Sequence, residues 1–259
     1  MSKPLIIGHR GASALAPENT MAAFRMAYDA GADGIEFDVR LSADGIPVVI
    51  HDEDLRRTCG LNKRVSDCSL DELKSFEFGS WFSQKTKTER SYDGEPILTL
   101  KELLESFPEH FVLYLEMKCE SSQRDELVET CSDLLKSTER KGQVIVESFD
   151  LKAIRLMKQI DSAVTTAALF EPSLSHPPLI ASQKIIERAK ESGANEIALH
   201  HRLASRRLVE LARDGGFRVV VWTVDETHWV ATCRQLGIDA LITNQPAVLL
   251  DQRDRILCD

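Results

Sequence analysis

Short apolar runs alternate with amphipathic stretches along almost the whole chain. The apolar runs are rich in Val and Ile and have few polar breaks, which is typical of strands that are covered on both faces. The amphipathic stretches carry apolar residues at helical spacing, as at Leu151, Ile154 and Met157. A strand followed by a helix, repeated many times, predicts a parallel sheet whose strands are joined by helical crossovers.

The number of these units matches the length of the chain. The strand-like runs are 5–8, 34–41, 46–51, 111–118, 143–148, 163–170, 196–200, 218–224 and 240–243. The helix-like stretches are 19–30, 99–106, 122–140, 150–160, 179–192, 203–213, 227–236 and 246–255. About eight strand–helix units in 259 residues predict an α/β fold, a TIM-like (β/α)8 barrel, because such a barrel takes roughly 250 residues. An open doubly wound sheet is the alternative.

One pair of strand-like runs does not fit the alternation. Runs 34–41 and 46–51 are joined by only four residues, and parallel neighbours need a crossover of about a dozen or more. The turn contains Asp44-Gly45, which is typical of a hairpin. We therefore expect 46–51 to return antiparallel along the second strand. This register brings His51 opposite residues 36–38, within a residue or two.

We expect residues 1–259 to form a single barrel domain with one long irregular segment. Residues 53–98 are polar and longer than an ordinary connection, and such segments usually carry function or some structure of their own. They are interpreted as an insertion covering the C-terminal face of the barrel. Within it, Ser69 followed by Leu-Asp-Glu predicts a short capped helix.

Composition and charge exclude several classes of partner. The chain has 41 acidic and 32 basic residues, whereas binding nucleic acid by charge needs clustered Lys and Arg. The longest strongly apolar run, 219–224, is far shorter than the roughly 20 residues of an integral membrane segment. No signal peptide pattern precedes the first strand, and the six cysteines are interpreted as reduced thiols. We expect a cytoplasmic protein, a monomer or homodimer, with a small-molecule substrate and no nucleic acid.

Acidic residues gather where barrel strands are expected to end. Functional residues of such barrels lie at the carboxyl ends of the strands. Glu36 and Asp38 are two residues apart in a strand, so both point to one face, and Glu116 ends a later strand. Three converging carboxylates would suit one divalent cation, Mg²⁺ or Ca²⁺. The alternative is that these side chains are solvated or ion-paired.

Basic residues occur at the same strand ends. His9 and His51 suit general acid–base catalysis, for example in phosphodiester cleavage, although a single His is more often a satisfied core residue. Arg10 and Lys118 would contact a phosphate group, or Lys118 would simply pair with Glu116. His200-His201 is assigned a capping or structural role.

Several motifs in fixed order resemble the glycerophosphodiester phosphodiesterase family. They are Gly8-His9-Arg10-Gly11, Pro17-Glu18-Asn19-Thr20, Gly34-Ile35-Glu36-Phe37-Asp38-Val39, His51-Asp52, Leu115-Glu116-Met117-Lys118, Val221-Trp222-Thr223-Val224 and Thr243-Asn244-Gln245-Pro246. The resemblance covers the whole chain and implies a TIM-like barrel with an insertion. It implies a divalent ion on Glu36, Asp38 and Glu116, and His9 and His51 as the acid–base pair. It also implies phosphate contacts by Arg10 and Lys118, with Glu18 and Asn19 near the site and Trp222 lining the apolar side of the cleft.

The resemblance implies metal-dependent hydrolysis of glycerophosphodiesters to sn-glycerol 3-phosphate and an alcohol. Attack by water and attack by a neighbouring glycerol hydroxyl, through a cyclic phosphate, both remain open. A lysophospholipase D or a cyclising phosphodiesterase on the same barrel is the alternative, followed by a non-catalytic phosphodiester-binding protein. One departure concerns Ile97-Leu98-Thr99-Leu100, where the family usually has proline before the Thr-Leu pair, so the exit from the insertion is not predicted in detail.

Overall fold

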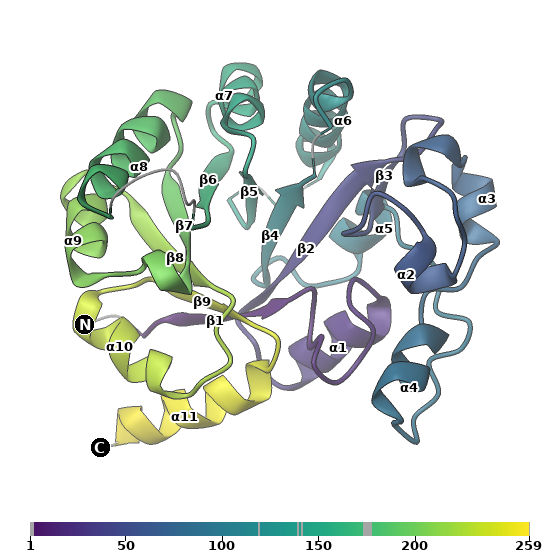
Figure 1. Ribbon diagram of the computed structural model, residues 1–259, viewed down its shortest axis with the longest axis horizontal. Coiled ribbons are helices and arrows are strands. Elements are labelled where there is room, and N and C mark those ends of the chain that lie inside the picture. The colour runs from purple at the N-terminus through teal and green to yellow at the C-terminus, as the bar shows by residue number, and fades with distance from the viewer. Residues whose placement is uncertain (1–2, 119, 139, 141, 173–177, 259) are drawn as a thin grey trace.

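The chain folds into a closed barrel of eight parallel strands (Figure 1). The computed structural model describes residues 3–118, 120–138, 140, 142–172 and 178–258. The parallel strands are β1 (Leu5–His9), β2 (Gly34–Leu41), β4 (Val112–Met117), β5 (Val144–Ser148), β6 (Thr165–Phe170), β7 (Glu196–His200), β8 (Arg218–Trp222) and β9 (Ala240–Thr243). β1 pairs with both β2 and β9, which closes the sheet. The predicted barrel is confirmed, and the open sheet is excluded.

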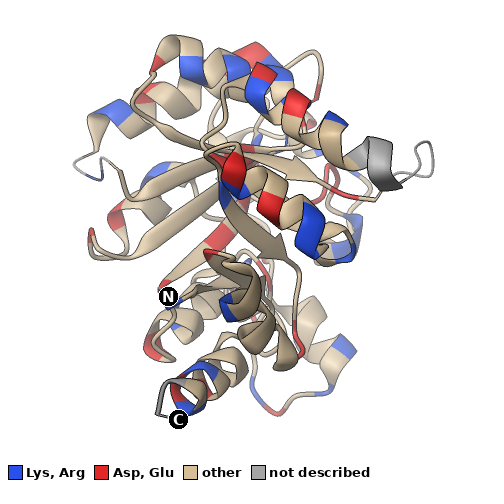
Figure 2. Ribbon diagram, turned by 90° about the vertical axis from the view of Figure 1, so that its left-hand side faces the viewer, with Lys and Arg blue, Asp and Glu red and all other residues tan. Residues whose placement is uncertain are grey.

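Helices surround the strands on the outside. They are α1 (Met21–Asp29), α2 (Arg56–Cys59), η1 (Val65–Asp67), α3 (Leu70–Lys74), α4 (Ser80–Thr86), α5 (Leu100–Glu105), α6 (Arg124–Ser137), α7 (Leu151–Ile160), α8 (Pro178–Ser192), η2 (His201–Leu203), α9 (Arg206–Asp214), α10 (His228–Leu236) and α11 (Pro246–Cys258). Their apolar residues pack on the outer faces of the strands, as Phe24 and Met157 do beside Phe37 and Val146. In Figure 2, basic and acidic residues are interspersed along these helices.

Side chains fill the inside of the barrel below the strand ends. Ile7, Ile145, Val220 and Ile242 belong to one buried cluster there, together with Tyr114. The Tyr114 hydroxyl donates a hydrogen bond of 2.9 Å to buried Glu196. The barrel interior is therefore a packed core rather than a channel.

The hairpin predicted beside the second strand is confirmed. β3 (Pro47–Val49) pairs antiparallel with β2, with Val39 opposite Val49. The Ile50 amide donates to the Asp38 carbonyl at 3.0 Å. Continuing this register brings His51 level with Phe37, between the two carboxylates of β2, as expected.

The segment 53–98 folds into short helices that pack on β3. Leu55, Val65, Leu73 and Phe78 form a buried cluster with Val48 of that strand. In Figure 1, α2, α3 and α4 lie together on the side of the barrel that carries β3 and α1. The Ser69 hydroxyl accepts a hydrogen bond from the Glu72 amide, which confirms the predicted cap of α3.

One element boundary was left open by the sequence and one predicted boundary is wrong. At the exit of the insertion, Thr99 and Glu102 form a reciprocal capping box, which starts α5 without proline. The helix expected over 203–213 starts later than predicted, because Leu203 ends η2 and α9 begins only after Ser205 caps it. The His200 ring accepts a hydrogen bond from the Arg202 amide, so its predicted capping role is confirmed.

Two further features of the chain are its cysteines and the apolar character of its helices. Cys59, Cys68, Cys131 and Cys233 are free thiols, whereas Cys119 and the side chain of Cys258 lie outside the described residues. Among the described residues, no helix combines the length and apolar character that crossing a membrane requires.

Candidate active site

Three buried carboxylates meet at the carboxyl ends of β2 and β4. Glu36, Asp38 and Glu116 each offer an oxygen, and these oxygens lie within 4.8 Å of one another. The two-residue period of a strand puts Glu36 and Asp38 on one face, and the register of the parallel pair sets Glu116 beside Asp38. The structure thus brings together the three residues that the sequence predicted as metal ligands. An all-oxygen cluster of this kind can hold a hard divalent cation.

Two cations contact the cluster without balancing it fully. Arg10 Nε lies 3.1 Å from an Asp38 oxygen, and Lys118 Nζ lies 3.1 Å from the other. Burial alone would raise the pKa of Asp38, but Arg10 and Lys118 outweigh it and hold that pKa well below its usual range. Burial and the charge of Asp38 raise the pKa of Glu116 to about 7 and that of Glu36 well above its ordinary value. The cluster therefore has room for further positive charge, which fits a metal ion.

Lys118 also forms the salt bridge with Glu116 that the sequence analysis gave as its alternative role. Its ammonium group lies 2.6 Å from an oxygen of Glu116 in β4, and Lys118 itself is the first residue after that strand. Because the same ammonium group also contacts Asp38 and lines the cleft, the salt bridge does not remove it from the site.

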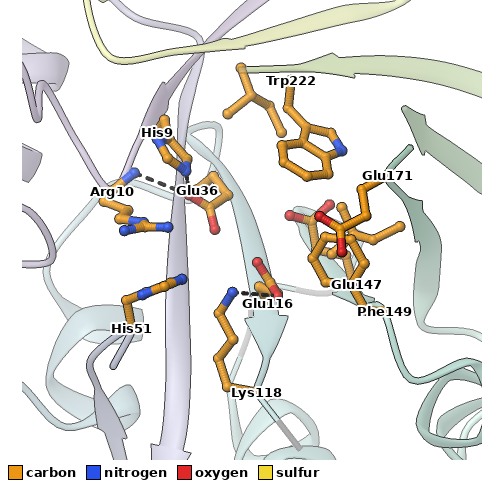
Figure 3. A pocket seen from close by; sticks show the side chains of 12 residues that line it. His9, Arg10, Glu36, His51, Glu116, Lys118, Glu147, Phe149, Glu171 and Trp222 are labelled. Carbon is orange, nitrogen blue, oxygen red and sulfur yellow. Dashed lines mark hydrogen bonds and ion pairs between the residues drawn. The ribbon is translucent and has the colours of Figure 1, made fainter. Parts of the chain in front are cut away.

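Both predicted histidines turn into the cleft (Figure 3). His9 Nδ1 lies 2.7 Å from Asn244 Oδ1, and the Asn244 amide nitrogen donates to Asp225. This second bond fixes the amide so that its oxygen accepts from His9. His51 Nδ1 lies 2.7 Å from Asp52 Oδ1. With each Nδ1 held in this way, both Nε2 atoms remain for chemistry in the cleft.

Burial gives His9 an unusual pKa. Desolvation, followed by the charge of Arg10, lowers the pKa of His9 from 6.5 to about 4. We expect the His9 ring to titrate near pH 4 by NMR in the metal-free protein, with His9→Gln identifying its signals. The unfolded chain takes up this proton near pH 6.5, so the free energy of unfolding falls as the pH drops from 6.5 towards 4. His9→Gln should lose less stability over this window, and titration at or above pH 6.5 would contradict this account of the site.

Glu18 and Asn19 hold the charged side chains in place. The Glu18 carboxylate accepts from Arg10 at 2.8 Å and from both terminal nitrogens of Arg57. Asn19 has a positive φ of 59° and donates its side-chain amide to Asp38 at 2.8 Å. Both residues therefore lie where the sequence placed them. Arg57, which also pairs with Asp52 on its other side, was not predicted as part of the site.

The cleft between these groups has a volume of about 160 Å³. Its lining residues are His9, Arg10, Glu36, His51, Glu116, Lys118, Glu147, Phe149, Leu169, Glu171, Trp222 and Ile242. Trp222 makes an edge contact with Phe149 and forms part of the apolar side, as predicted. Sequence reasoning missed Glu147 and Glu171, although each lies at or just beyond a strand's carboxyl end, where the other candidates were found.

Known proteins share this barrel and these motifs. Residues 9–248 match the glycerophosphoryl diester phosphodiesterase family. A glycerophosphodiester phosphodiesterase of Caldanaerobacter subterraneus subsp. tengcongensis is 32% identical over 250 residues, covering 96% of this chain and 97% of that protein. A phosphodiesterase of Oleispira antarctica, solved with the product sn-glycerol 3-phosphate, matches with a TM-score of 0.84 and 27% identity over 97% of each chain. A glycerophosphodiester phosphodiesterase of Thermotoga maritima matches with a TM-score of 0.74 and 27% identity over 97% of this chain and 99% of that one.

These matches define the class of the protein. The chain is an enzyme of the phosphoric diester hydrolase class with a TIM-barrel fold. It belongs to the glycerophosphoryl diester phosphodiesterase family, as its motifs implied.

Proposed function

We propose that this enzyme hydrolyses glycerophosphodiesters to sn-glycerol 3-phosphate and an alcohol, with one divalent cation, Mg²⁺ or Ca²⁺. The observation that carries the proposal is a single cleft lined by acidic, basic and imidazole groups suited to a phosphodiester. The product bound to the Oleispira antarctica relative adds support, because the same compound would be released here.

The proposed roles follow from the geometry. Glu36, Asp38 and Glu116 would hold the cation, which when bound supplies positive charge to a phosphate oxygen. Arg10 and Lys118 would contact the remaining phosphate oxygens, and Glu18 and Asn19 keep the charged groups in position.

Proton transfer falls to the two histidines in this proposal. One Nε2 would take a proton from the nucleophile, and the other would give a proton to the leaving alcohol. Asn244 and Asp52 hold the rings by their Nδ1 atoms, so neither ring needs to turn before it acts. Trp222 would shield the apolar side of the substrate.

Product identification tests the proposed reaction. Incubation with glycerophosphoethanolamine should give sn-glycerol 3-phosphate and ethanolamine. The reaction is monitored by ³¹P NMR and by an enzymatic assay for sn-glycerol 3-phosphate. Formation of phosphoethanolamine and glycerol instead would contradict the proposal. Comparison of glycerophosphocholine with its acylated form separates the lysophospholipase D alternative, which requires the acylated compound to be the better substrate.

We further propose that residues 1–259 act as one catalytic domain in which the insertion 53–98 covers the C-terminal face of the barrel. The shared apolar cluster of Val48, Leu55 and Phe78 supports this, as does the contact of Arg57 with Glu18.

We also propose that the protein is cytoplasmic, that its partner is a small-molecule substrate, and that it is a monomer or a homodimer. The free thiols support this location, because cysteines stay reduced there.

A further inference from the structure

Glu147 is a buried carboxyl group to which the proposed reaction gives no role. It lies near the carboxyl end of β5, is 1% exposed and lines the cleft. Among the described residues, no group forms a hydrogen bond with its Oε2 atom. A buried polar atom without a partner is costly, so it indicates a site that a ligand completes.

Its position sets it apart from the carboxylates that can hold a metal. Glu147 is the neighbour of Glu116 across the β4–β5 ladder, but it is not among the three residues whose oxygens cluster within 4.8 Å. Figure 3 shows it on the side of the cleft away from Arg10 and His51. Glu147 therefore lies across the cleft from Arg10, one of the two groups proposed to contact the phosphate.

The cleft that Glu147 lines has an apolar side as well as charged groups such as Glu171 and Lys118. Leu169, Trp222 and Ile242 line the cleft with it, and the residue opposite it in the next strand, Ala167, is small. A short carbon chain bearing a hydroxyl matches such walls, because its carbons meet hydrocarbon and its hydroxyl meets the carboxyl group. A carboxyl group offers an acceptor oxygen in either protonation state.

We propose that Glu147 accepts a hydrogen bond from a free hydroxyl of the glycerol half of the substrate and so makes the enzyme selective for unacylated glycerol. The inference rests on the proposed function. An acyl ester at this hydroxyl has no hydrogen to donate, and it leaves the buried carboxyl group unpaired. Glu147 is thus a specificity residue, distinct from the groups that bind the phosphate.

Binding of two phosphate monoesters tests this role. Calorimetry measures the dissociation constants of sn-glycerol 3-phosphate and propyl phosphate for the enzyme with Mg²⁺ or Ca²⁺. Propyl phosphate has the same three carbons but lacks the two hydroxyl groups. The wild type should bind sn-glycerol 3-phosphate about 10- to 100-fold more tightly, because propyl phosphate leaves the buried carboxyl group unpaired. In Glu147→Met this preference should fall below about threefold, with the affinity for propyl phosphate little changed. Glu147→Gln keeps an acceptor oxygen and should keep most of the preference.

Each other outcome overturns the inference. The inference is wrong if the wild type binds sn-glycerol 3-phosphate no more tightly than propyl phosphate, and this result does not depend on whether Glu147→Met folds. An unchanged preference in Glu147→Met would assign the selectivity to other groups, and an equal loss of both ligands would assign Glu147 a structural role. Release of sn-glycerol 3-phosphate from glycerophosphoethanolamine by the wild type is measured separately. If that reaction fails, the proposed function fails, whichever result the binding preference gives.

Discussion

Replacing either His9 or His51 with alanine is expected to lower kcat by at least about 100-fold, the usual size of an acid–base contribution. The expectation rests on the two rings, each held by its Nδ1 atom with Nε2 left for the cleft. Steady-state release of sn-glycerol 3-phosphate from glycerophosphoethanolamine, at saturating substrate and with the cation present, measures the effect.

His110→Ala is the matched control for the histidine variants. His110 is exposed in the turn before β4, at the amino end of that strand and so at the opposite end from the site, and its loss should leave kcat unchanged. Circular dichroism and the melting temperature should show that all three variants are folded. Near-normal turnover in both His9→Ala and His51→Ala would remove the acid–base pair from the account.

The second large effect is expected from Asp38→Asn. This change keeps the shape of the side chain but removes the charge that Arg10, Lys118 and the proposed cation share. Loss of a ligand to a catalytic metal removes several kcal/mol of transition-state stabilisation, so kcat/KM should fall about 10³-fold or more. The affinity for Mg²⁺ or Ca²⁺, measured by calorimetry, should fall in parallel.

Asp133→Asn, on the exposed face of α6, provides the control for Asp38→Asn. It should change neither kcat/KM nor cation affinity. An Asp38→Asn enzyme that binds the cation as tightly as the wild type would contradict the proposed ligand set, whatever its activity.

Much of the site could be predicted because strand geometry is regular. The two-residue period placed Glu36 and Asp38 on one face, and the short Asp44-Gly45 turn determined where the chain returned to His51. These relations depend on local chain geometry, so the spacing along the sequence was enough. The barrel itself followed from the alternation of strands and helices for the same reason.

The supporting contacts could not be predicted, because they join segments that only the finished barrel brings together. Asp225, after β8, orients the Asn244 amide that holds His9. Arg57 reaches Glu18 from the insertion, whose path depends on its own small core. Glu147 shows a different limit. Its position at a strand end was visible, but whether it had a partner depended on the neighbouring strands.

Removal and return of the divalent cation tests the central claim, that the three-carboxylate cluster holds an ion on which phosphodiester hydrolysis depends. The wild type is treated with EDTA, freed of chelator and assayed for release of sn-glycerol 3-phosphate while Mg²⁺ or Ca²⁺ is titrated back, with bound ion measured in parallel. We expect activity to disappear with the metal and to return in proportion to one ion bound per chain. Full activity in the chelated, metal-free enzyme would contradict the account.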